Sequence, residues 1–129
     1  MAQQGTPDEA CVRRDLSARA GSFLAVWGAP VLIGLAAGTL APSTAWTAGA
    51  WSLVLAWMGG ACLVNARRCG RLHCYVSGPI LLVGAGLTAA SGGGVLDFGP
   101  TGVSLIVAAT LALAVLTYLL ELVWGRYRR

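Results

Sequence analysis

A long run of residues without a single charged side chain is the feature that most constrains this fold. No Asp, Glu, Lys or Arg occurs from Ala20 to Ala66, a run of 47 residues. About 20 residues suffice for one helix to cross the hydrocarbon core of a bilayer, so the run must fold back on itself. Pro42-Ser43-Thr44 offers a turn near its middle. The run therefore predicts two membrane-spanning helices, at about 22–41 and 46–66.

Composition agrees with a membrane protein and excludes other classes. Hydrophobic residues make up 57% of the 129-residue chain and charged residues only 11%, whereas soluble domains average about 25% charged residues. A domain this small could not cover its surface with so few charges if it were in water. The same hydrophobicity excludes an intrinsically disordered chain.

The second half of the chain predicts two further spans. An apolar segment covers about 75–91 and ends at Gly92-Gly93-Gly94, because three glycines are unfavourable inside a helix. Asp97 and Pro100 mark a loop before a last apolar segment at about 101–124. We expect an all-α fold, an integral membrane four-helix bundle over 22–129, preceded by a polar N-terminal segment, 1–21.

The placement of arginine predicts the orientation of this bundle. The basic residues are nine arginines and no lysine, and they fall before the first span, between the second and third, and after the fourth: Arg13, Arg14, Arg19, Arg67, Arg68, Arg71, Arg126, Arg128 and Arg129. By the positive-inside rule, both termini and the central loop should be cytoplasmic. We therefore expect a multi-pass protein of the bacterial inner (cytoplasmic) membrane. Its partner would be the lipid bilayer, and we expect it not to bind nucleic acid.

One segment gathers most of the reactive side chains. The central loop and its flanks carry Cys62, Cys69 and Cys74 and the only histidine, His73. Gly70 can take the left-handed conformation that ends a helix after Cys69. Cys62 lies two helical turns before Cys69, about 10 Å along the axis. It would therefore be a separate ligand deeper in the membrane rather than chelate a metal ion together with Cys69.

Thiolate and imidazole ligands favour a soft metal ion such as mercury, copper(I) or zinc. The candidate ligands are Cys69, His73 and Cys74 at the cytoplasmic face, with Cys62 deeper, and Cys11 could swing in from the N-terminal segment. Arg68 and Arg71 flank the cluster and would favour the thiolate form of Cys69. The leading hypothesis is therefore binding or transport of a soft heavy-metal ion. Its partners beyond the bilayer and the ion would be further copies of the chain in a homo-oligomer, or a cytosolic metal-accepting protein.

The segment from Asn65 to Pro79, which contains Arg-Cys-Gly-Arg-x-His-Cys-Tyr, resembles a motif of small prokaryotic membrane proteins of uncharacterised function. The chain is also similar, more loosely, to mercuric-ion transport proteins, which are small multi-helix proteins with cysteine pairs in a helix and at the cytoplasmic face. That resemblance implies mercury as the ion.

Two other functions fit the same residues. The protein could be a non-catalytic structural or assembly subunit whose cysteines only pack, or a thiol redox sensor. The chain has no Cys-x-x-Cys pair and no motif typical of an enzyme, so we expect it not to be one. Glu121, near the end of the fourth span, is expected to pair with an arginine of the central loop or tail, or to take part in proton or metal transfer. Asn65 lies at a similar depth and is expected to hydrogen-bond between helices.

Overall fold

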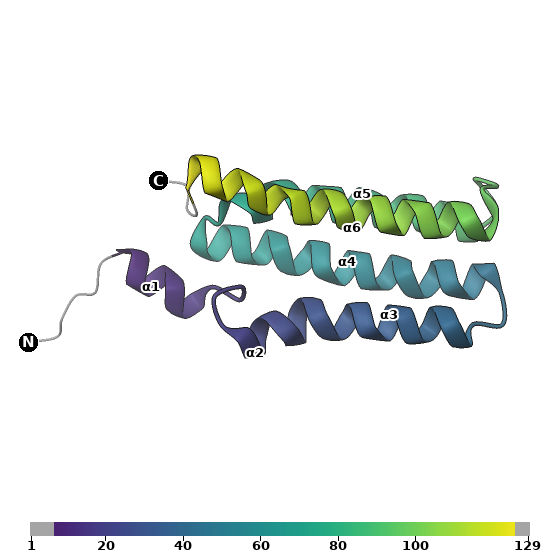
Figure 1. Cartoon of the computed structure of the whole chain (residues 1–129), viewed down its shortest axis with the longest axis horizontal. Helices are drawn as coiled ribbons and strands as arrows, with labels where there is room; N and C mark the ends of the chain where they lie inside the picture. The colour runs from purple at the N-terminus through teal and green to yellow at the C-terminus, as the bar shows by residue number, and fades with distance from the viewer. Residues whose placement is uncertain (1–6, 126–129) are drawn as a thin grey trace, which may run out of the picture.

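A computed structural model describes residues 7–125 and shows an all-α fold (Figure 1). The predictions for Arg126, Arg128 and Arg129 concern positions outside the described residues. The α-helices are α1 (Pro7–Arg14), α2 (Ala20–Phe23), α3 (Ala29–Leu40), α4 (Thr44–Cys69), α5 (Leu72–Gly92) and α6 (Gly99–Trp124).

The prediction of four membrane-spanning helices is confirmed. Ala20–Leu40, Thr44–Cys69, Leu72–Gly92 and Gly99–Trp124 are each long and apolar enough to cross a bilayer, which makes the chain a multi-pass membrane protein. The observed ends differ from the predicted ones by a few residues. The largest differences are at α4, which extends to Cys69, and at α5, which begins at Leu72.

The first span is not a regular α-helix. A π-helical stretch, Leu24–Gly28, joins α2 to α3 just before Pro30. Proline has no N–H to donate, and its ring collides with the carbonyl group four residues earlier. The wider π turn accommodates both effects, so the irregularity caused by Pro30 lies in the turn that precedes it.

The connections follow the predicted turn chemistry. The Ser43 hydroxyl caps α4 by accepting a hydrogen bond from the Trp46 amide at 3.3 Å. Gly70 has φ 64° and ends α4 in the left-handed conformation, as predicted. It lets α5 begin two residues later, so Cys69 and Cys74 lie on either side of a very short connection.

Helix α4 is the centre of the bundle, and α3 and α5 both pack against it, while α6 packs mainly on α5. The α4–α5 contact is close because Gly59 and Gly78 face each other: a Cβ atom added at Gly59 would lie 3.0 Å from the Gly78 carbonyl oxygen. Many large apolar side chains outside this core are exposed, among them Leu32, Leu53 and Leu105. In a membrane protein these side chains face lipid.

One end of the bundle carries the polar side chains. Helix α1, the α4–α5 connection and the end of α6 all lie at this end (Figure 1). The described arginines belong to these segments or border them. The segment before the first span, predicted only as polar, thus contains a short helix. The buried side chain of Asp15 follows this helix directly.

Candidate functional site

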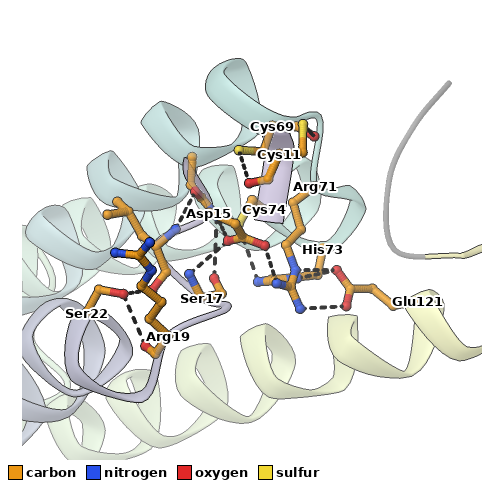
Figure 2. A network of polar contacts seen from close by, with 12 residues as sticks. Cys11, Asp15, Ser17, Arg19, Ser22, Cys69, Arg71, His73, Cys74 and Glu121 are labelled. Carbon is orange, nitrogen blue, oxygen red and sulfur yellow. Dashed lines mark hydrogen bonds and ion pairs between the residues drawn. The ribbon is translucent and has the colours of Figure 1, made fainter. Parts of the chain in front are cut away.

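A buried polar network fills the arginine-bearing end of the bundle (Figure 2). Its first part joins the N-terminal segment to α4. The amide nitrogen of Asn65 donates to a carboxylate oxygen of Asp15 at 2.9 Å, and its carbonyl oxygen accepts from the Leu16 backbone amide at 3.0 Å. These two bonds hold the residues that follow α1 against α4. The hydrogen bond expected between helices is a third one, from the Asn65 amide nitrogen to the Cys74 sulfur on α5 at 3.6 Å.

Arg71 joins two acidic side chains that lie far apart in the sequence. Its Nη1 donates to Asp15, and its Nε and Nη2 donate to the two oxygens of Glu121 at 3.1 and 3.2 Å. The paired geometry of a guanidinium and a carboxylate gives the strongest kind of ion pair. The predicted pairing of Glu121 with an arginine of the central loop is confirmed, and Arg71 is that arginine.

The charges of this network shift the pKa values of Asp15 and Arg71, the two charged groups of the network that lie outside the spans. Burial raises the pKa of Asp15, but hydrogen bonds from Asn65 and Ser17 and the nearby Arg71 guanidinium outweigh it and hold the pKa below its ordinary 3.8. Burial lowers the pKa of Arg71, but Glu121 and Asp15 outweigh it and keep the pKa above its usual value. Asp15 is therefore a carboxylate and Arg71 a cation at neutral pH.

His73 lies between Glu121 and Cys74. Its Nδ1 is 2.5 Å from the Glu121 carboxylate, and its Nε2 is 3.3 Å from the Cys74 sulfur. The ring also stacks on Tyr118, with centroids 4.0 Å apart. With the imidazole proton on Nδ1, which the carboxylate favours, Nε2 is free to accept the thiol proton. The result is a thiol–imidazole–carboxylate arrangement in which Glu121 orients His73 and stabilises its charged form.

Cys62 completes the inner group of thiols. It belongs to the same buried cluster as Cys74, where α4 packs on α5, and its thiol accepts a hydrogen bond from the Ser77 hydroxyl at 3.5 Å. Cys62 and Cys74 are only 1% and 0% exposed. The cysteine predicted to lie deeper in the membrane thus shares a buried cluster with Cys74.

Cys69 is placed differently from the prediction that groups it with His73 and Cys74. Its thiol donates to the Cys11 carbonyl at 3.2 Å, and the Cys11 thiol donates to the Cys69 carbonyl at 3.5 Å. Cys11 does approach from the N-terminal segment, as suggested, but it meets Cys69 alone. Donation to a carbonyl needs the protonated thiol, so this contact does not favour the thiolate expected beside the arginines. Arg68 is exposed.

The cysteines therefore form two pairs, Cys62–Cys74 and Cys11–Cys69, rather than one cluster. Across residues 7–125, no group of three or more His, Cys, Asp or Glu side chains is arranged to hold a metal ion. Sequence reasoning missed Asp15 and the stacking of Tyr118 on His73. Asp15 carried a weak signal, as a carboxylate directly between the N-terminal arginines and the first span.

No protein family, curated protein or solved structure matches the chain. The candidate function therefore rests on the geometry of this site.

Proposed function

We propose that this multi-pass membrane protein works through a reversible dithiol, in which Cys62 and Cys74 alternate between two thiols and a disulfide. The observation that carries the proposal is the placing of two buried thiols from neighbouring helices in one cluster, with a histidine–carboxylate pair directed at one of them. By the distribution of arginines, we place this end of the bundle on the cytoplasmic side of the bacterial inner membrane.

The roles of the surrounding residues follow from thiol chemistry. The thiolate is the reactive form of cysteine. His73 can take the Cys74 proton at Nε2, and Glu121 stabilises the resulting imidazolium through Nδ1. Arg71 holds Glu121 with two hydrogen bonds and is itself held by Asp15. Burial protects the pair from soluble thiols, which keep exposed cytoplasmic cysteines reduced.

The test uses a variant that keeps only the inner pair. Cys11→Ser/Cys69→Ser protein in lipid nanodiscs is treated with diamide, and free thiols are counted by maleimide labelling after denaturation. We expect both thiols to become protected within one chain and to return after reduction. If both stay open to labelling while the protein remains helical, the dithiol function is wrong. Cys62→Ser/Cys74→Ser protein is the matched control for the outer pair.

A second candidate function is binding of a soft metal ion by the same inner pair. Copper(I) and mercury(II) accept two thiolate ligands, so Cys62 and Cys74 could hold such an ion without a third. The approach of His73 Nε2 to Cys74 favours this candidate, because it places an imidazole beside the thiols. Titration with copper(I) separates the two pairs: one ion bound by Cys11→Ser/Cys69→Ser protein and none by Cys62→Ser/Cys74→Ser protein would support it, and equal uptake would contradict it.

A further inference from the structure

A cavity beside the inner cysteine pair is not explained by thiol chemistry alone. It has a volume of about 560 Å³ and lies between the first span and α6. Trp27 and Val31 line it on one side, Leu111 and Ala114 on the other. Both walls pack beside α4, yet the backbones of α3 and α6 do not approach each other closely over the described residues. The cavity therefore opens sideways, toward the lipid.

The floor of the cavity carries its few polar groups. Cys62, His73 and Ser77 line this inner part, and Tyr118 stands beside them on α6. Cys74 does not line the cavity; it lies next to His73, in the same buried cluster as Cys62. A molecule that enters from the bilayer would thus meet the Cys62 thiol and the His73 imidazole, with the Cys74 thiol next to the imidazole.

These features define the chemistry of the occupant. Its body must be apolar, since the walls are apolar and the entrance faces lipid. Its head must accept a hydrogen bond, which the Tyr118 hydroxyl group can donate, since the Ser77 hydroxyl already donates to Cys62. A volume of this size suits a small-molecule ligand. The head must also take electrons, because the buried dithiol lies beside a cavity that opens toward the lipid, and its oxidant must therefore dissolve in the lipid. A phospholipid chain meets the first condition only.

We propose that the cavity between the first span and α6 binds an isoprenoid quinone, whose ring oxidises the Cys62–Cys74 dithiol while its tail extends into the bilayer. This inference rests on the proposed dithiol function and names the oxidant. The flat ring fits a cavity with the Trp27 and Tyr118 rings in its walls.

The reaction balances with residues at the site. The Cys62 sulfur adds to the quinone ring, and its proton passes to a quinone oxygen. His73 removes the Cys74 proton, and the Cys74 thiolate attacks the Cys62 sulfur. The S–S bond forms as the bond between Cys62 and the ring breaks, and that electron pair returns to the ring. The imidazolium gives its proton to the second quinone oxygen. Two thiols and one quinone become one disulfide and one quinol.

The experiment follows a single turnover. Reduced Cys11→Ser/Cys69→Ser protein in nanodiscs is mixed with decylubiquinone, and the loss of quinone absorbance is compared with the loss of free thiols. We expect one quinol for each disulfide formed. Ala114→Phe, which fills the cavity, should slow oxidation by the quinone about tenfold or more by displacing the ring. Oxidation by diamide should stay unchanged. Ala109→Phe, on the same helix but lining a separate groove between α5 and α6, should change neither rate.

The two proposals fail in different ways. If diamide forms the disulfide but the quinone does not, the quinone site is wrong and the dithiol function stands. If quinone oxidation is equally fast in Ala114→Phe protein, the quinone reacts elsewhere and the site is also wrong. The quinone site is also wrong if phospholipid or a second copy of the chain occupies the cavity and decylubiquinone does not displace that occupant. If diamide forms no disulfide, the dithiol function itself is wrong.

Discussion

The two cysteine pairs lie near the same end of one bundle, yet their surroundings differ sharply. Cys62 and Cys74 are buried between α4 and α5, with His73, Glu121 and Arg71 behind them. Cys69 is also buried, but it and Cys11 bond to each other's backbone carbonyls, and Cys11 is partly accessible. The inner pair has His73 as an acid–base partner, and its Cys62 lines a cavity.

This difference shows that proximity of two thiols is not enough to assign a function. The outer pair helps to fasten the N-terminal segment to the end of α4, where carbonyl groups need donors. The inner pair contributes little to fastening, because α4 and α5 already pack closely through Gly59 and Gly78. The inner pair is therefore the better candidate for chemistry and the outer pair for structure.

The largest expected effect is the loss of Arg71. Arg71→Ala leaves the carboxylates of Asp15 and Glu121 without their shared cation in a buried site. Breaking such a pair costs about 3–5 kcal/mol. We expect thermal unfolding in detergent, followed by tryptophan fluorescence, to shift to a clearly lower temperature.

Arg68→Ala is the matched control, because Arg68 is exposed at the same end of the bundle. Its stability should stay within about 0.5 kcal/mol of wild type, as is usual for surface substitutions. Equal destabilisation by the two substitutions would show that Arg71 acts as a general positive charge rather than as the bridge between the two carboxylates.

The second effect should separate the chemistry of the two pairs. Glu121→Gln keeps the size of the side chain but removes the charge that stabilises protonated His73. We expect disulfide formation by Cys62 and Cys74 with diamide to slow about tenfold at neutral pH, as for the loss of an acid–base aid. The Cys11–Cys69 pair should react at its wild-type rate. Asp97→Asn removes an exposed carboxylate from the opposite end of the bundle and should change neither. If Glu121→Gln slows disulfide formation equally in both pairs, Glu121 does not assist the inner pair specifically.

The third effect concerns the anchoring of the N-terminal segment by Asp15. Because the pKa of Asp15 is lower in the folded protein than its ordinary 3.8, its ionised form stabilises the fold above that value. This stabilisation is lost as the pH falls through the lower, folded-state pKa. In scans from about pH 6 to about pH 3, wild type should lose more stability than Asp15→Asn protein. If the difference in stability between wild type and Asp15→Asn protein stays constant with pH, the contribution of Asp15 does not depend on its ionisation.

The fold was largely predictable from the sequence, because charge-free runs and turn residues are local signals. The Pro42-Ser43-Thr44 turn and the helix end at Gly70 each depend on a few adjacent residues. The π-helical stretch was only partly predictable. A proline inside a helix, here Pro30, indicates an irregularity, but a helix can accommodate a proline in several ways.

The site was less predictable, because it depends on contacts between distant residues. Glu121 reaches His73 across 48 positions, and Asp15 reaches Arg71 across 56. Helical spacing correctly separates Cys62 from Cys69, but it cannot tell which of these two α4 thiols shares its surroundings with Cys74 on α5. That choice follows from the rotation of α5 against α4, which the glycine contact sets. Spacing along the chain therefore suggested one cluster where the fold makes two pairs.

The smallest expected effect is the loss of the outer pair. Cys11→Ser/Cys69→Ser keeps a donor at each position, and a thiol is only a weak donor, so the free energy of unfolding should change by less than about 1 kcal/mol. Asn65 would still bind Asp15 and the Leu16 amide, so the N-terminal segment should remain attached to α4. Thermal unfolding checks the first point, and protection of the Leu16 amide from hydrogen exchange checks the second. A loss of several kcal/mol, or rapid exchange at Leu16, would mean that the outer thiols hold the segment in place. The outer pair would then carry the anchoring that is assigned here to Asp15 and Asn65.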